Sequence, residues 1–398
     1  MLKLRKATVV EAHRARGPEQ NLVVMLANGE RRPAIADVRL LGVSVVGDEL
    51  IVNVQARDLA LGSGGFDIVH VNLTRGLVAD GTPGAHVMKL NYTSMQHAVV
   101  PVEDALKGTG TQTGTGTEMG ATANGTSAGG ELDLPLERPV GVLALHGQLA
   151  ALAWAFAQAQ PDLRLGFVQT PGGALPGGRS RVVRELRERG LLAGHLTAGA
   201  SYGGEGEAIT TAGAIHHGLR ILGWDAAVCG PGPGIVGSSS PLGHGGMHAL
   251  DSTHTALALG AQALLVARMS SADERERHRG ISHHTLTVLD LLLEPVTVAL
   301  PAGIRSPVGA DLRAGLGSVF ARSAERGKLQ LELEVERPAR MAHHDWRHAA
   351  VDLPGYLASG LPAMTMGRGL VEDPLFFAAA LSGGTVLAEL CGLAPQER

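Results

Sequence analysis

The stretch VGVLALHGQLAALAWAFAQA, residues 140–159, decides the fold class of this chain. Residues 140–145 are apolar without alternation, which is typical of a strand buried on both faces of a parallel sheet. His146, Gly147 and Gln148 then interrupt the apolar run, and the alanine-rich remainder predicts a helix. The stretch approaches the length of a membrane span, but a strand, a turn and a helix fit the interruption better.

The same alternation continues towards the carboxyl end of the chain. The strand candidates are residues 140–145, 164–169, 192–198, 225–229, 262–267 and 296–300. The helix candidates are residues 147–160, 180–190, 205–222, 247–259 and 282–293. Residues 330–336 are a candidate edge strand, and residues 372–391 a candidate closing helix. This order predicts an α/β fold with a doubly wound, mostly parallel sheet.

The segments before residue 134 have a different character. Residues 1–100 alternate short β-like runs with turns such as Asn28–Gly29, a strong hairpin signal, and predict a small, mostly β domain. Residues 105–133 contain a run of Gly and Thr that cannot bury enough apolar surface, and they predict a flexible linker or insertion. We expect residues 134–398 to form a Rossmann-like α/β domain.

Composition limits the classes of function. The chain has 398 residues, of which 44% are hydrophobic and 18% charged, with a net charge of −4. This balance predicts a soluble protein and argues against a nucleic-acid surface built on bulk positive charge. Two cysteines exclude a disulfide framework, and without an apolar signal segment at the start they favour a cytoplasmic location. We expect a small-molecule ligand, no nucleic acid and no membrane; homo-oligomers stay open.

The loops expected at the carboxyl ends of the strands are rich in glycine and polar residues. In an open parallel sheet, ligands bind outside these ends. The loops expected on the opposite edge, residues 159–162 and 222–224, are short and plain. Because economy alone would give short turns on both edges, the difference predicts a functional site on the carboxyl edge.

Residues 277–285, RHRGISHHT, precede one of the predicted helices. Ser282 is the expected N-cap, which places His283 and His284 in the first turn, with His284 on the apolar face. The helix N-terminus favours an anion and a neutral histidine, and Arg277 and Arg279 could clamp a carboxylate or phosphate. His284 would then be the acid, base or ligand, with His283 beside it. Alternatively, these histidines are structural and the arginines pair with nearby acidic residues, namely Asp273, Glu274 and Glu276.

Two glycine-rich loops are further candidates for ligand binding. The first, within residues 230–246, offers close backbone approach and hydroxyl donors at Gly232, Gly234, Gly237, Ser238 and Ser239. It matches neither a P-loop nor a dinucleotide fingerprint, and a purely structural connection is the alternative.

The second loop carries Gly203, Gly204 and Glu205 at the predicted start of the helix over 205–222. An acid there complements the helix dipole, and a general base is the more specific alternative.

Histidine spacing suggests two metal sites. His244 and His248, with Asp251 and His254, would share one arc if a helix began near His244, and such a set could bind zinc, manganese or iron. Gly245 and Gly246 weaken that helix start. The string HHDWRH, residues 343–348, is a second candidate, but a chain with 17 histidines produces such pairs by chance. The sequence does not identify a cofactor.

Three strings, CGPGPGIVGSSSPLGHGG (229–246), ERHRGISHHTLT (276–287) and SYGGEGEAIT (201–210), together resemble a bacterial family, domain-of-unknown-function family 3866. The resemblance runs over most of the chain and implies no activity or catalytic residue. Three functions therefore stay open: an enzyme acting on a small anionic metabolite, a ligand-binding or regulatory protein without turnover, and a metal-dependent hydrolase.

Overall fold

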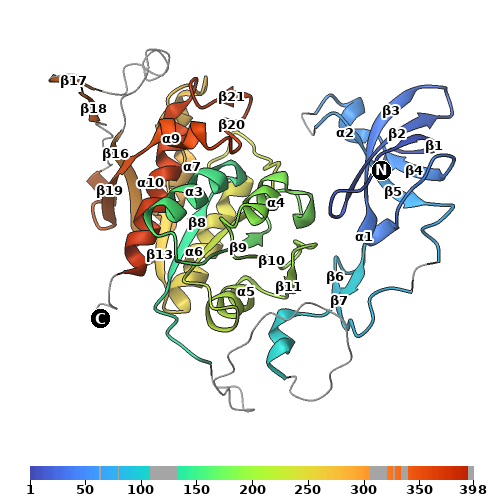
Figure 1. The fold of residues 1–398 in the computed structure, drawn as a ribbon, viewed down its shortest axis with the longest axis horizontal. Coiled ribbons are helices and arrows are strands. Elements are labelled where there is room, and N and C mark those ends of the chain that lie inside the picture. The colour runs from blue at the N-terminus through green and yellow to red at the C-terminus, as the bar shows by residue number, and fades with distance from the viewer. Residues whose placement is uncertain are drawn as a thin grey trace. The chain divides into compact units, whose positions relative to one another are not determined.

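The computed structural model describes residues 1–61, 64–78, 80–107, 132–304, 321–325, 328–332 and 339–392. The chain forms two compact units, Met1–Val100 and Pro101–Arg398 (Figure 1). Most of the linker predicted over 105–133 lies outside the described residues.

The first unit is a closed barrel of five strands in the order β1-β2-β3-β5-β4. The strands are β1 (Leu4–Ala12), β2 (Glu19–Leu26), β3 (Arg31–Asp37), β4 (Glu49–Asn53) and β5 (Asp67–Asn72). Alternate residues such as Val24, Leu50 and Val52 fill the interior. The short elements of this unit are α1 (Val38–Leu41), α2 (Gln55–Asp58), β6 (Val87–Lys89) and β7 (His97–Val99). The predicted mostly β region is confirmed.

The second unit contains an eight-stranded sheet in the order β11-β10-β9-β12-β8-β13-β16-β19. Its strands are β8 (Pro139–Leu143), β9 (Leu165–Thr170), β10 (Gly194–Ala198), β11 (Gly206–Ala208), β12 (Ala226–Pro231), β13 (Gln262–Val266), β16 (Thr297–Ile304) and β19 (Asp345–Val351). Every neighbouring pair is parallel. The predicted parallel sheet is confirmed, and β12 is inserted between β8 and β9.

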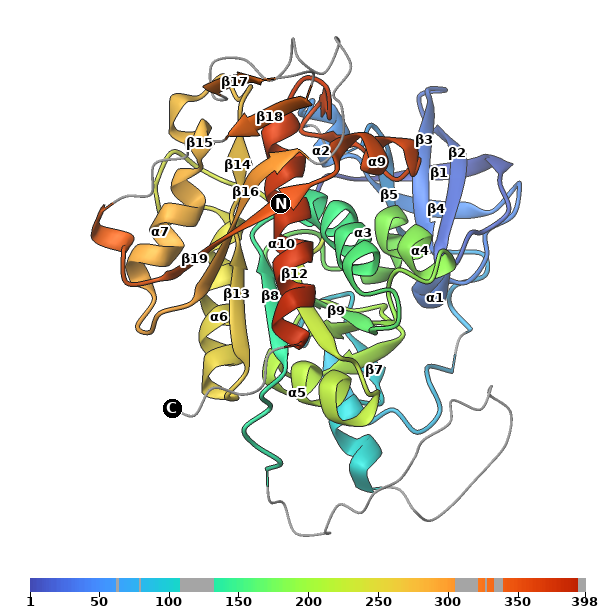
Figure 2. The ribbon, with the colours of Figure 1, turned by 60° about the vertical axis from the view of Figure 1, so that its left-hand side comes forward.

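Helices cover both faces of this sheet, as a doubly wound fold requires. On one face α10 (Pro374–Cys391) contacts the strands and α3 (Leu149–Ala159), and α4 (Arg181–Glu188) and α9 (Leu353–Ala358) pack against α3. On the other face α5 (Thr211–His216) and α6 (His248–Ala258) contact the strands, and α7 (His283–Leu291) packs against α6. Figure 2 shows α10 and α3 in front of the sheet. Within the described part of the chain, α10 alone is long and apolar enough to cross a membrane, but 83% of it is buried, which is typical of a core helix.

Two sequence predictions differ from the structure. The helix expected over 205–222 is replaced by β11, α5 and a π-helical turn, His217–Ile221, because residues 206–208 pair with β10. One edge of the sheet is β19, which pairs with β16. Of the candidate 330–336, residues 330–332 belong to β18 (Lys328–Glu332), which forms a hairpin with β17 (Ala321–Glu325), and residues 333–336 lie outside the described residues. Two small ladders complete the fold, β14 (Met269–Ser270) with β15 (Gly280–Ile281) and β20 (Met364–Thr365) with β21 (Arg368–Gly369).

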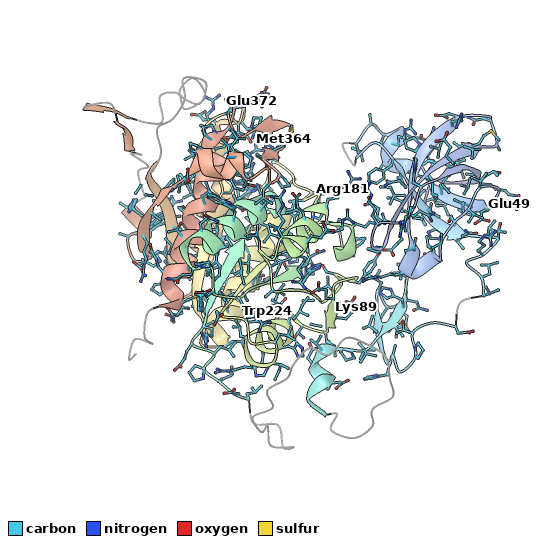
Figure 3. All side chains as sticks on the ribbon, viewed as in Figure 1. Glu49, Lys89, Arg181, Trp224, Met364 and Glu372 are labelled. Carbon is cyan, nitrogen blue, oxygen red and sulfur yellow. The ribbon has the colours of Figure 1, made fainter. Side chains whose placement is uncertain are left out.

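The amino ends of β9, β10 and β12 enclose the indole of Trp224, which is labelled in Figure 3 and 1% exposed. A Cβ atom would lie 1.9 Å from this ring at Gly166, 2.8 Å at Gly194 and 2.3 Å at Gly218. Each of these glycines is therefore required for the indole to fit.

Candidate functional site

Four histidines gather at the carboxyl edge of the sheet, and we call them, with Arg268, the histidine site. His244 lies in the connection from β12 to α6, and His278 lies in the connection from β13 to α7, whose first two residues are His283 and His284. Arg268 follows the end of β13. Because β12 and β13 flank β8, these two connections leave the sheet close together.

The start of α7 is fixed to the end of β13. Ser282 is the N-cap, and its hydroxyl accepts a hydrogen bond from the backbone N–H of His284 at 3.3 Å. The backbone N–H of Ser282 donates to the carbonyl of Arg268, and the backbone N–H of Arg268 donates to Oγ1 of Thr285. The histidines of the first turn are therefore held in place relative to Arg268.

The imidazole rings lie in contact with one another. His244 and His284 stack, with ring centroids 3.5 Å apart and 14° between the planes. His244 and His283 lie edge to face, 5.8 Å apart at 78°. One ring nitrogen from each of these three histidines lies within 4.8 Å of the other two. The centroid of His278 is 4.8 Å from both His283 and His284.

His244, His278 and His284 are buried, and several ring nitrogens of the histidine site lack hydrogen-bond partners. Among the described residues, no hydrogen-bond partner is in place for either ring nitrogen of His244 or for the buried Nε2 of His283. The carbonyl of Pro241 lies close enough to His244 to oppose the lowering of its pKa by burial. An unpaired buried polar atom is costly. The site therefore favours a ligand that binds these nitrogens.

The other two histidines have partners. Nδ1 of His278 is 2.8 Å from the Ser282 hydroxyl, and Nδ1 of His284 is 2.8 Å from Nη1 of Arg268. Burial, and secondarily the charge of Arg268, lower the pKa of His284 to about 2 and that of His278 to about 3. These imidazoles are therefore neutral at physiological pH.

A buried carboxylate anchors the cations around the site. Asp273 accepts hydrogen bonds from Nε of Arg275 at 3.0 Å, Arg368 at 3.4 Å and Arg268 at 3.5 Å. Burial opposes ionisation, but the hydrogen bonds from Arg275 hold the pKa of this carboxyl well below its usual value. Asp373, also buried, accepts from the Ser270 hydroxyl and from Nε of Arg368.

Sequence reasoning gave Arg268 no role and considered Asp273 only as a structural partner. A usable signal was present, since Arg268 directly follows an apolar strand whose carboxyl end was expected to face the site. Arg277 and Arg279 are both exposed, and Arg279 donates from Nε to the carbonyl of Asp273. The structural alternative paired them with acidic side chains, but the carboxylate of Asp273 pairs with Arg275 instead.

The predicted arc of metal ligands over residues 244–254 is wrong. His244 precedes the helix because Gly245–Met247 form a 3-10 turn, and α6 begins at His248. Nδ1 of His248 lies 3.4 Å from Asp251, and Nε2 of His254 accepts from the backbone N–H of Leu293. Only His244 of this set joins the histidine site. In the string HHDWRH, His348 lies on β19, so no helix brings it to His344.

Two glycines of the loop within residues 230–246 allow it to pack closely against the loop that follows β9. A Cβ atom at Gly232 would lie 2.2 Å from the carbonyl oxygen of Ala174, and one at Gly245 would lie 2.0 Å from that of Gly172. The two carboxyl-edge loops thus approach backbone to backbone. The remaining predicted residues of this loop are exposed, namely Gly234, Gly237, Ser238 and Ser239.

The loop with Gly203, Gly204 and Glu205 lies between β10 and β11. These two strands lie at one end of the strand order, and three strands separate β10 from β13. Glu205 accepts from Nε of Arg187 at 2.7 Å. It precedes a strand rather than a helix, so the proposed role in complementing a helix dipole is wrong.

Comparison with known proteins identifies a family whose description names no activity. A family model described as "Protein of unknown function (DUF3866)" matches residues 33–384. Neither the curated proteins nor the solved structures provide a significant match.

Proposed function

Since the chain belongs to the DUF3866 family, whose description names no activity, we propose a function from the geometry of the histidine site alone. The protein is an enzyme that acts on a small anionic metabolite, and a divalent transition-metal ion held by His244, His283 and His284 supports hydrolysis.

The observation that carries this proposal is the proximity of three neutral imidazoles, each with one ring nitrogen within 4.8 Å of the other two. The stacked rings of His244 and His284 would turn to bind one ion together. Metal binding requires neutral imidazole, and the lone pairs of His244 and His283 have no competing partner among the described residues. Three histidines with an open fourth position form a common catalytic zinc set. Such an ion supplies Lewis acidity and an activated water.

The charges around the site support an anionic substrate. The positive charges of Arg277, Arg268 and Arg275 all lower the pKa of His283, after burial, so the potential at the first turn of α7 is positive. The N-terminus of this nine-residue helix adds a partial positive charge there. Arg277 is exposed and able to reach a bound carboxylate or phosphate.

Elemental analysis of protein purified without added metal or chelator tests the proposal. We expect about one equivalent of zinc, manganese or iron per chain. His244→Ala and His283→Ala should lose the metal, whereas His248→Ala, which removes a nearby histidine outside the site, should retain it. A metal-free protein that stays empty after reloading at neutral pH contradicts the metal centre.

A metal-free enzyme is the second candidate, and the contact between Arg268 and His284 favours it. A guanidinium only donates, so Nδ1 of His284 accepts and Nε2 carries the proton, where the neutral imidazole can donate a hydrogen bond to negative charge that develops on the substrate. In that case His284→Ala should abolish turnover while ligand affinity stays nearly unchanged. A loss of affinity alone would instead indicate a binding or regulatory protein.

Two finer expectations complete the proposal. The strand order reverses direction beside β8, which supports a Rossmann-like arrangement of the site. Both cysteines are free thiols, Cys229 buried and Cys391 half-buried, which supports the reducing environment of the cytoplasm.

A further inference from the structure

Arg268 occupies an unusual position for a residue beside a metal ligand. Its side chain is 3% exposed. Both its backbone N–H and its carbonyl bind the start of α7, at Thr285 and Ser282. The guanidinium is therefore presented to His284 by a fixed backbone, and its contact with Nδ1 at 2.8 Å is a built feature of the site.

This contact blocks metal binding by His284 on both of its nitrogens. The Nδ1 lone pair accepts from Arg268, and a neutral imidazole must then carry its proton on Nε2. A histidine ligand normally has the opposite partner, a carboxylate or carbonyl that accepts from the second ring nitrogen. His284 becomes a ligand only when Arg268 releases it. Nδ1 can then bind the ion itself, or the proton can move from Nε2 to Nδ1 so that Nε2 binds.

An alternative position for the guanidinium is already present. Nη2 of Arg268 lies 3.5 Å from Oδ2 of Asp273, a carboxylate that is 2% exposed. A small shift would turn this long contact into a charge-assisted hydrogen bond as the one to His284 breaks. The stacked ring of His244 must turn at the same time, because two parallel rings 3.5 Å apart cannot direct their in-plane lone pairs at one ion.

We propose that Arg268 is a built-in competitor of the metal ion: it holds His284 in the metal-free state and moves to Asp273 when the ion binds. The inference rests on the proposed metal centre. It gives the site two arrangements, one with the guanidinium on the imidazole and one with it on the carboxylate. Metal affinity is thereby lower than the three histidines alone would give.

Zinc titration of the full-length, metal-free protein tests this role. Arg268→Gln replaces a group that only donates with an amide that can also accept from Nδ1, and Arg268→Met removes the charge and the donors. Both variants should bind zinc about 10- to 100-fold more tightly than the wild type, the range over which such outer partners act. Arg340→Met, which removes an exposed guanidinium paired with Asp290 near the carboxyl end of α7 and does not touch the histidine site, is the control and should bind like the wild type.

The outcomes separate the two proposals. If the wild type binds one zinc and both Arg268 variants bind equally or more weakly, the competitor role is wrong and the metal centre stands. If neither the wild type nor the variants bind zinc, the metal centre itself is wrong.

Nuclear magnetic resonance of the histidine nitrogens gives a readout that needs no variant. In the metal-free protein Nδ1 of His284 should be the unprotonated nitrogen that accepts from Arg268, and zinc binding should change its resonance, either by coordination or by protonation. An Nδ1 resonance that stays unchanged in the zinc-bound protein would overturn the inference.

Discussion

The imidazole of His146 and the hydroxyl of Ser180 form a buried hydrogen bond of 2.7 Å between the loops that follow β8 and β9. On the other side of the ring, Nδ1 lies 3.0 Å from the carbonyl of Pro231, the last residue of β12. Since a carbonyl only accepts, Nδ1 carries the proton and Nε2 accepts from Ser180. One neutral imidazole therefore connects three neighbouring strand ends.

Folding stability should fall in acid partly through His146. Complete burial lowers its pKa from 6.5 to about 4, so the unfolded chain binds a proton at a higher pH than the folded protein does. Stability from this residue is full above pH 6.5 and declines as the pH falls towards 4, by about 3 kcal/mol in total. Urea unfolding at several pH values would measure the decline.

Other buried histidines contribute to the same pH dependence, so His146→Asn provides the comparison. The wild type should lose its advantage over this variant as the pH is lowered through that window. A difference in unfolding free energy that stays constant from neutral pH to pH 4 would show that His146 is protonated equally in both states.

Ser180→Ala should destabilise the protein by about 2 kcal/mol or more. The hydroxyl of Ser180 accepts from the backbone N–H of Val183 as the N-cap of α4, and it also donates to His146. Its loss removes a helix cap and leaves a buried acceptor unpaired. Chemical denaturation measures the change in unfolding free energy.

Thr210→Ala is the matched control for this variant. Thr210 caps α5 by accepting from the backbone N–H of Gly213, and its loss should cost only about 1 kcal/mol. Equal losses from the two variants would mean that the hydrogen bond to His146 adds nothing to stability.

Asp273→Asn should destabilise the second unit by about 3 kcal/mol or more. The change keeps the size of the side chain but leaves the buried guanidinium of Arg268 without its counter-charge and also weakens the contacts of Arg275 and Arg368. Asp290→Asn removes an exposed partner of Arg340 and should change stability by less than about 1 kcal/mol. Thermal unfolding of both variants compares them, and similar losses would contradict a special role for the buried carboxylate.

The fold of the second unit was largely predictable because its central strands are apolar without alternation. Burial on both faces leaves such a pattern in each strand, from residues 140–145 onwards, without information from the rest of the chain. The strand order was not predictable, because nothing local specifies that β12 enters between β8 and β9. The strand β19 was missed because its edge position allows charged residues such as Asp345 and Arg347.

The site was predictable only within one segment of the chain. The N-cap at Ser282 and the burial of His284 follow from local periodicity, and both are confirmed. The contact of His244 with His284 depends on how two connections leave the sheet, which sequence spacing does not reveal. Extending a helical pattern through Gly245 and Gly246 gave the wrong neighbours for His244.

The glycine-lined enclosure of Trp224 has a spectroscopic consequence. Its indole is fully buried and lies at the amino ends of the strands, the opposite edge from the histidine site. Emission from this ring should therefore be shifted to the blue and should report the integrity of the sheet, without responding directly to an ion bound among the histidines. In a variant whose other two tryptophans, Trp154 and Trp346, are replaced by Phe, this indole provides an intrinsic optical standard against which a signal from the other edge can be measured.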